Sequence, residues 1–296
     1  MLLLDGKIPM RWWDNSRNFG DLLGPWLVSK MTGREVQWVA KDDPHYLVVG
    51  SILGRVSRAS VVWGVGSFGS EGVKNLTGGS RYLAVRGPLT RARLEMFKHK
   101  CPRVYGDPAL LAPDVYKPDV PKTHELGIVL RWSETKRKER FSVEGVKVID
   151  LLTDDIEGTI DQMLSCENIL TTSLHGMILA DAYHIPNAWL IANTGYGKEH
   201  KFWDYLLSVG KEREPAEAAL LDSGWTLEKL LSEFNYDGRP VQLDLGPLRE
   251  SNPFLERSDE IKAAEKAAIV GSKKMRAGND GARPIAQPAY LDQRGS

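Results

Sequence analysis

Short apolar runs alternate along this chain with stretches whose apolar positions recur at helical spacing. The first part carries three runs typical of buried strands, at 46–49, 60–63 and 82–85. A helix is predicted before them, and its apolar face is formed by Phe19, Leu22, Leu23, Trp26 and Leu27. Another helix is predicted to begin at Pro88, since proline suits the first helical position. This alternation predicts parallel strands joined by crossover helices.

The same alternation resumes after a stretch rich in proline. Residues 112–125 hold three prolines and few core candidates, which predicts an extended connector and a domain boundary. Beyond it the pattern predicts strands at 126–131, 146–150, 169–170 and 187–191, and helices at 155–166, 199–209 and 226–234. We therefore expect an α/β protein of two Rossmann-type, doubly wound parallel-sheet domains facing a cleft, at 1–117 and 118–250, with a partly helical or disordered tail at 251–296.

The most informative stretch is 168–190, which predicts a strand, a polar loop, a helix and a further strand. Three hydroxyl residues at 171–173 precede the helix, so that His175 falls in its first turn. Free N–H groups and the positive end of the helix dipole favour a phosphate or a carboxylate at such a turn. The alternative is that His175 is an ordinary polar residue of the domain surface.

Composition excludes several classes of protein. The chain has 296 residues, and its 39 Lys and Arg residues balance 39 Asp and Glu residues, so no global basic field exists to hold nucleic acid. Its two cysteines, Cys101 and Cys166, belong to no metal-binding or disulfide pattern, so we expect no metal and a reducing compartment. The apolar start is too short for a signal peptide and no long apolar run follows, which predicts a cytoplasmic protein, at most peripheral to a membrane.

A glycine pattern follows the second apolar run. Residues 64–69 match the G-x-G-x-x-G pattern of a dinucleotide-binding turn, but no acidic residue for a ribose stands about 20 positions further on. Two interpretations remain for this segment, which includes Gly66 and Ser67. It is either a loop whose backbone approaches a ligand closely or a plain tight turn.

Several polar residues stand where predicted strands end. Arg86, Asp107 and Arg131 occupy such positions, as does the segment 171–175. Ligands of open α/β sheets collect beyond the carboxyl ends of strands, where an arginine can grip a carboxylate or a phosphate. Each of these residues alone is equally compatible with an ordinary polar strand end, but together they favour a binding site.

Two further groups are candidates for the same site. Asn18 and Asp21 precede or open the first long helix, so each is either a capping residue or, for Asp21, an acceptor of a substrate hydroxyl proton. Lys198, His200 and Lys201 follow a glycine-containing loop and either close over an anion or are solvated. Five aromatic residues near predicted strand or loop ends either stack on sugar rings or pack in the core: Trp12, Trp13, Trp63, Phe68 and Trp132.

Taken in order, five short motifs resemble the polysaccharide pyruvyltransferase family. They are Asn18-Phe-Gly-Asp21, Gly64-Val-Gly-Ser67, Val85-Arg-Gly-Pro88, Tyr105-Gly-Asp-Pro108 and Ser173-Leu-His-Gly176. The resemblance extends to about residue 210 and is greatest to the bacterial ketal pyruvyltransferases of exopolysaccharide assembly. It implies a GT-B-like pair of domains that moves pyruvate from phosphoenolpyruvate to two hydroxyls of one sugar and releases phosphate, with no cofactor besides the donor.

The resemblance, together with the positions of the polar residues described above, predicts roles for individual residues. His175 and Asp21 are expected to be catalytic, and the first domain is expected to bind the acceptor. The expected phosphoenolpyruvate-binding residues are Arg131, Thr172, Ser173, Leu174, Lys198 and Lys201. The expected acceptor-binding residues are Asn18, Gly66, Ser67, Arg86 and Asp107. A lipid-linked glycan acceptor would place the enzyme at the inner face of the cytoplasmic membrane.

The chain departs from the family at one position. Family members often carry arginine immediately before the Leu-His pair, whereas this chain has Ser173, and Lys198, Lys201 or Arg86 are the candidates to replace that charge. Two other functions therefore stay open at this point. One is a GT-B glycosyltransferase that uses a nucleotide sugar, and the other is a glycan-binding assembly subunit without activity.

Overall fold

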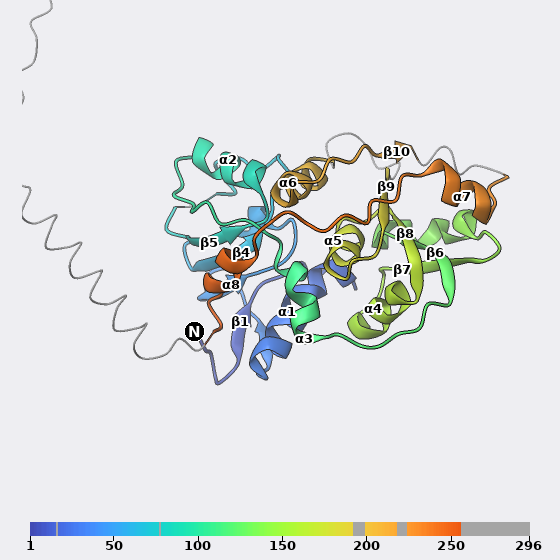
Figure 1. Ribbon diagram of the computed structural model, residues 1–296. Coiled ribbons are helices and arrows are strands. Elements are labelled where there is room, and N and C mark those ends of the chain that lie inside the picture. The colour runs from blue at the N-terminus through green and yellow to red at the C-terminus, as the bar shows by residue number, and fades with distance from the viewer. Residues whose placement is uncertain (16, 77, 192–198, 218–223, 256–296) are drawn as a thin grey trace, which may run out of the picture. The chain divides into compact units, whose positions relative to one another are not determined.

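The computed structural model describes residues 1–255 except 16, 77, 192–198 and 218–223, and Met1–Phe254 form one compact unit. The unit contains two five-stranded sheets in which every strand pair is parallel. Helices lie around both sheets (Figure 1). The expected α/β class and the Rossmann-like pattern of parallel strands and crossover helices are therefore confirmed.

The first sheet uses only residues before the proline-rich stretch. Its strands are β1 (Ile8–Met10), β2 (Val36–Trp38), β3 (His45–Leu47), β4 (Ser60–Val65) and β5 (Arg81–Val85), in the order β2-β1-β3-β4-β5. The helical elements of this part are α1 (Phe19–Thr32), η1 (Leu53–Arg55), α2 (Pro88–Met96), η2 (Pro108–Leu111) and α3 (Ala112–Val115).

The second sheet repeats that arrangement. Its strands are β6 (His124–Leu130), β7 (Val146–Asp150), β8 (Cys166–Thr171), β9 (Asn187–Ile191) and β10 (Ala216–Glu217), in the order β10-β9-β8-β6-β7. The helical elements are η3 (Trp132–Phe141), α4 (Ile156–Leu164), α5 (Leu174–Ala182), α6 (His200–Val209), α7 (Leu227–Glu233) and α8 (Gly246–Glu250). In each sheet the first strand of that half lies between the second and the third.

The predicted strands and long helices are present, and the differences lie at their ends. Residues 112–115 were expected to be extended but form α3, because Pro113 occupies an early helical position and Ala112 is buried in the core. Arg131 follows β6 instead of ending it, and Cys166 begins β8 instead of ending a helix. The short strands β1, β2 and β10 gave no periodic signal. Of the tail expected at 251–296, the residues after Leu255 lie outside the described part of the chain.

Local chemistry explains how α1 is delimited. The side-chain oxygen of Asn18 accepts a hydrogen bond from the backbone N–H of Gly20, which satisfies a free donor of the first turn. At the other end Gly33 adopts a left-handed conformation with φ 65°, and its N–H donates to the carbonyl of Ser29. Asn18 is therefore the capping residue, and Asp21 is left available for another role.

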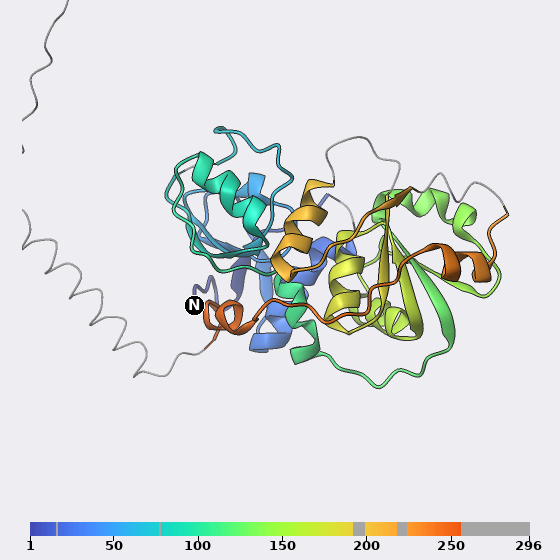
Figure 2. The same cartoon turned by 45° about the horizontal axis from the view of Figure 1, so that its top comes forward.

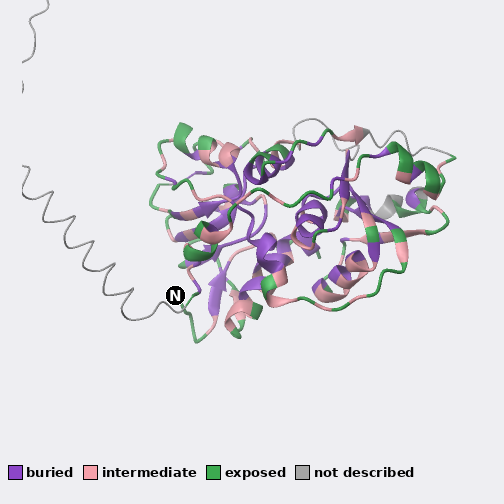
Figure 3. Ribbon diagram, in the orientation of Figure 1, coloured by how far each residue is buried: buried purple, intermediate pink, exposed green. Residues whose placement is uncertain are grey.

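Burial is concentrated in the two sheets and in the helices that face them (Figure 3). Helix α5 is buried along most of its length, which agrees with the apolar composition that surrounds His175. In both views of the ribbon, α1, α5 and α6 lie between the strands of the first sheet and those of the second (Figures 1 and 2). The helix that carries His175 is therefore held on several sides.

The chain crosses between the two halves more than once. After α7, the segment that contains α8 returns to the first half, where the indole N–H of Trp63 donates to the carbonyl of Leu248 at 3.0 Å. The ring of Phe254 packs against Tyr46 with centroids 4.7 Å apart. Residues near the end of the described chain thus complete the core of the first sheet.

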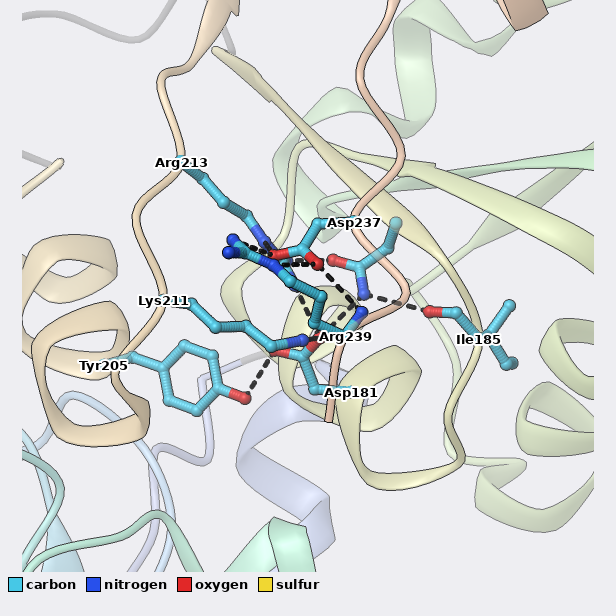
Figure 4. A network of polar contacts seen from close by, with 8 residues as sticks. Asp181, Ile185, Tyr205, Lys211, Arg213, Asp237 and Arg239 are labelled. Carbon is cyan, nitrogen blue, oxygen red and sulfur yellow. Dashed lines mark hydrogen bonds and ion pairs between the residues drawn. The ribbon is translucent and has the colours of Figure 1, made fainter. Parts of the chain in front are cut away.

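A buried polar network fixes the far end of α5 (Figure 4). The carboxylate of Asp181 lies 2.9 Å from the ammonium of Lys211 and 2.7 Å from the guanidinium of Arg213. The hydroxyl of Tyr205 donates to the same carboxylate at 2.8 Å. Because all these side chains are buried, each charge depends on its partners for the solvation that water would otherwise provide.

We expect Asp181→Asn to lower the free energy of unfolding by about 3 kcal/mol or more, because two buried cations would lose their shared counter-charge. The measurement is urea unfolding at neutral pH. The matched control is Glu35→Gln, which breaks the ion pair with Lys7, where the two side chains are 68% and 40% exposed. That change should cost less than about 1 kcal/mol. Similar losses for the two variants would contradict this account of the network.

Candidate active site

The strand order of the two sheets determines where a ligand can bind. In each sheet the second strand lies on one side of the first strand, and the third strand lies on its other side. The connections therefore run in opposite directions from the gap between β1 and β3 and from the gap between β6 and β8. Such a separation leaves a crevice beyond the carboxyl ends of the two strands. Residues that follow β1, β3, β6 and β8 are therefore the ones expected to face a ligand.

One cavity collects residues from all four positions. It has a volume of about 490 Å³. Its lining comes from both halves of the chain: Trp13, Asn18, Asp21, Ser51, Ile52, Gly54, Arg55, Phe68, Ser70, Glu71, Asn75, Arg131, Trp132, Ser173, Leu174, His175 and Lys201. The two crevices thus form a single site.

Many of the residues expected to bind ligand line this cavity. They are Asn18 and Asp21 from the first half, and Arg131, Ser173, Leu174, His175 and Lys201 from the second. Arg131 and His175, which were expected to bind one small molecule, line the same cavity. Their roles stay predictions, but their placement satisfies the geometric condition on which those roles depend.

The cavity mixes cations with two carboxylates. Arg55, Arg131 and Lys201 contribute positive charge, while Asp21 and Glu71 contribute carboxyl groups. Burial raises the pKa of Asp21 above its ordinary value, although the neighbouring His175 and the hydrogen bond from Asn18 act in the opposite direction. A carboxyl group that binds a proton more readily than usual is suited to accept one from a hydroxyl.

Thr172 supports Arg131 from behind the cavity. It was expected to contact phosphoenolpyruvate, but it is not among the lining residues. Its hydroxyl oxygen instead accepts a hydrogen bond from the backbone N–H of Arg131 at 3.0 Å, and its hydroxyl donates to the buried carboxylate of Glu134. The role of Thr172 in this structure is therefore to fix the start of the segment that carries Arg131.

The turn before α5 is held by Thr171. Its hydroxyl oxygen accepts a hydrogen bond from the backbone N–H of Ser173 at 3.0 Å, while the Ser173 side chain makes no capping bond to the described first turn of α5. Of the three hydroxyl residues at 171–173, Thr171 therefore holds the turn, and Ser173 lines the cavity.

Arg86 has a structural role and does not reach the cavity. Its side chain is fully buried, its Nε lies 3.0 Å from the carboxylate of Asp204, and its other nitrogens donate to Ser51 and to the carbonyl of Ser67. The expectation that Arg86 binds the acceptor or replaces the missing arginine was wrong, because its guanidinium is committed to these partners. It joins β5 to α6 across the two halves.

The glycine segment approaches Arg86 instead of a ligand. A Cβ at Gly66 would overlap the guanidinium of Arg86, and a Cβ at Gly64, where φ is +89°, would overlap the ring of Pro108. The Ser67 side chain is buried and donates to Glu71 at 2.5 Å. The described residues of 66–80 contain no helix, so the segment is not a dinucleotide-binding turn, and neither Gly66 nor Ser67 lines the cavity.

Asp107 lies next to His175, outside the cavity lining. Its Oδ2 is 3.8 Å from Nε2 of His175, and its side chain is fully buried. It was expected to contact the acceptor, but its position is behind the imidazole. Of the basic cluster after β9, Lys198 lies outside the described residues. Lys201 lines the cavity, and its ammonium is 5.9 Å from the centre of the Phe68 ring.

The aromatic residues divide between the cavity and the core. Trp13 and Trp132, one from each half, line the cavity with ring centroids 5.1 Å apart, and Phe68 lines it with 41% of its surface exposed. Trp63 is completely buried and Trp12 packs against the core. The sequence left open whether these residues pack in the core or face a ligand. Trp12 and Trp63 pack in the core, whereas Trp13, Phe68 and Trp132 line the cavity.

Sequence reasoning missed Arg55 and Glu71. Arg55 ends η1, a few residues after β3, so the rule about carboxyl strand ends could have identified it. Glu71 carries no such signal, because its position depends on the hydrogen bonds that its carboxylate accepts from Ser67 and from the N–H of Phe68.

Comparison with known proteins agrees with this geometry. The sequence model of the family described as polysaccharide pyruvyl transferase matches residues 38–193, which include Arg131 and His175. The chain belongs to the polysaccharide pyruvyl transferase family. It is therefore a transferase, and the family supports pyruvyl transfer to a polysaccharide.

A relative in Acanthamoeba polyphaga mimivirus, uncharacterized protein L143, is 31% identical over 217 residues, which cover 67% of this chain and 72% of that protein. No solved structure matches this chain. Within the part of the chain that the structure describes, no helix is long and apolar enough to span a membrane. The same residues hold no cluster of His, Cys, Asp and Glu that could bind a metal ion.

The raised pKa of Asp21 predicts a pH-dependent effect of Asp21→Asn. A carboxyl group whose pKa is raised on folding contributes stability below its ordinary pKa of 3.8, and this contribution is lost as the pH rises through the folded value. The amide of the variant does not titrate. The free energy of unfolding of the variant minus that of the wild type should therefore increase from about pH 4 upward and then level off. Urea unfolding across this range measures the difference, and a decrease with pH would contradict the assignment.

Proposed function

We propose that this transferase moves the pyruvyl group of phosphoenolpyruvate onto two hydroxyls of one sugar in a glycan. The observation that carries the proposal is that Arg131 and His175 line one cavity with Arg55 and Lys201. In the reaction the enol carbon of the donor forms two C–O bonds to the sugar and loses its phosphate. One hydroxyl proton ends on the methylene carbon, which becomes a methyl group, and the other leaves with the phosphate.

The cavity offers charges that match the donor. Phosphoenolpyruvate carries a carboxylate and a phosphate, and an arginine can bind either of them with two parallel hydrogen bonds. Arg131 is the proposed clamp at the end of β6, with Ser173 and Leu174 beside it at the start of α5. Lys201 and Arg55 supply the positive charge that Ser173 does not. These groups would stabilise the negative charge of the leaving phosphate.

Two titratable side chains are proposed to move the protons. His175 would deliver a proton to the methylene carbon, and the buried carboxylate of Asp21 would accept one from a sugar hydroxyl. Asn18 holds Asp21 by donating its amide N–H to the carboxylate. Both proton-transfer groups line the same cavity as the proposed donor clamp.

The acceptor is proposed to enter from the side of the first half. Trp13 and Phe68 of the first half present aromatic surface in the cavity beside Trp132 of the second half, and sugar rings pack well on such faces. In this proposal the acceptor lies over the first sheet and the donor over the second, as in a GT-B-like arrangement. A lipid-linked oligosaccharide at the inner face of the cytoplasmic membrane is the acceptor that we propose to test first.

We expect His175→Ala and Arg131→Ala each to lower the rate of phosphate release from phosphoenolpyruvate at least about a hundredfold, because a proton donor or an electrostatic clamp is lost. Phosphate release and formation of an acid-labile ketal on the oligosaccharide are measured together. His184→Asn and Arg34→Ala are the matched controls, since both residues are exposed and lie outside the cavity. Unchanged turnover in the two cavity variants, with unfolding temperatures like the controls, would refute the proposed roles.

Ligand-induced stabilisation tests the identity of the donor. Phosphoenolpyruvate should raise the unfolding temperature of the wild type, because a ligand that binds only the folded state stabilises it by mass action. Arg131→Ala should abolish that increase at the same ligand concentration. A uridine or guanosine diphosphate that raises the unfolding temperature while phosphoenolpyruvate does not would instead favour a glycosyltransferase.

A further inference from the structure

The imidazole of His175 is enclosed by a carboxylate on one edge and by a glycine on the other. Its Nε2 lies 3.8 Å from Oδ2 of Asp107. Both atoms are buried, and neither has a hydrogen-bond partner among the described residues. A buried carboxylate oxygen without a hydrogen-bond donor destabilises the folded state, so a donor beside Oδ2 of Asp107 would stabilise it.

Asp107 is fixed so that only one of its oxygens can serve His175. Its Oδ1 accepts a hydrogen bond from the backbone N–H of Ala109 at 3.0 Å, which caps η2. The following Pro108 packs against Gly64 and holds the turn in place. The second oxygen, Oδ2, therefore faces the imidazole from a rigid position.

The opposite edge of the imidazole lies against the first turn of α1. A Cβ built on Gly20 would be 3.0 Å from both Cε1 and Cγ of His175, and closer still to Nδ1. No other residue type fits at position 20 without displacing the ring. Because Nε2 is buried, the 12% of the His175 side chain that is exposed must belong to its other atoms.

We propose that Asp107 and Gly20 are positioning residues which fix the tautomer and the orientation of His175. Asp107 takes the Nε2–H of the neutral imidazole, which requires a movement of about 1 Å to reach an ordinary hydrogen-bond length. Nδ1 is then the nitrogen left for the substrate, and the absence of a side chain at Gly20 leaves room beside it. Nδ1 delivers a proton when the ring is an imidazolium, whose positive charge Asp107 balances. This inference rests on the proposed function of His175, although its first test requires no substrate.

Asp107→Asn tests the tautomer directly. The amide oxygen keeps the cap on Ala109, so the amide N–H₂ takes the place of Oδ2 and donates to Nε2, which moves the ring proton to Nδ1. Histidine labelled with ¹⁵N shows which nitrogen carries the proton in the neutral form, and His175→Ala identifies the signal. We expect Nε2–H in the wild type and Nδ1–H in the variant. Nδ1–H in the wild type, or the same tautomer in both proteins, would overturn the proposal.

The rate of phosphate release separates this inference from the proposed function. Asp107→Asn should lower kcat about a hundredfold, because an amide that donates to Nε2 cannot stabilise the imidazolium that delivers the proton. The KM for phosphoenolpyruvate should change little, since the donor clamp is intact. If the wild type releases no phosphate from phosphoenolpyruvate, the proposed function fails while the tautomer measurement still decides the role of Asp107.

Gly20→Ala and Gly24→Ala form a matched pair within α1. A Cβ at Gly24 would meet its nearest atom, the backbone nitrogen of Val49, at an ordinary 3.5 Å. Alanine favours a helix over glycine at either position. We expect Gly24→Ala to retain turnover and the unfolding temperature, and Gly20→Ala to lower turnover about a hundredfold through displacement of the ring.

The His175→Ala background shows whether the clash is with the imidazole. Displacement of the ring should make Gly20→Ala lower the unfolding temperature in the wild-type background. In the His175→Ala background, where the ring is gone, the same substitution should not lower it. A loss of the same size in both backgrounds would overturn the role of Gly20. Turnover of Gly20→Ala equal to that of Gly24→Ala would do so as well.

Discussion

The structure depends on one topological constraint, which is that parallel strands can be joined only by crossovers that leave all their carboxyl ends at one edge. Both sheets place their first strand between the second and the third, and both therefore open a crevice at the same relative position. The residues that follow β1 and β3 meet those that follow β6 and β8 around one cavity. A ligand held there can touch groups supplied by both halves, which suits a transferase that brings a donor and an acceptor together.

Buried charge pairs keep the elements around that cavity in place. Arg86 binds Asp204 between β5 and α6, while Asp181 binds Lys211 and Arg213 at the end of α5. Such pairs contribute modestly to net stability, but removal of one partner leaves an unsolvated charge and is expensive. Charged residues therefore have two kinds of role in this protein. Some guanidinium groups hold helices in register, and others face the cavity.

Sequence patterns predicted that Arg131 faces a ligand, but they could not distinguish it from Arg86, which holds two elements together. Arg86 and Arg131 stand at equivalent places after buried strands, yet the acidic partner of Arg86 is Asp204, whose position beside it arises only from tertiary packing of α6 on α2. The longer strands, the long helices and the turn at His175 were predictable because their apolar periodicity is local, whereas β1, β2 and β10 are too short to show one. Helix α3 was not predictable, because it is a single turn that packs in the core through Ala112. The position of Glu71 was not predictable either, because it depends on hydrogen bonds within one irregular turn. Asp107 was expected to contact the acceptor, and only the structure shows that its carboxylate lies beside the imidazole of His175.

The return of the chain through α8 has a mechanical consequence. The halves are joined by the segment before β6 and again by the segment after α7, whose Leu248 and Phe254 are anchored in the first core (Figure 2). Two covalent crossings restrict any opening movement far more than one would. Any movement of one half relative to the other must therefore leave both crossings in place.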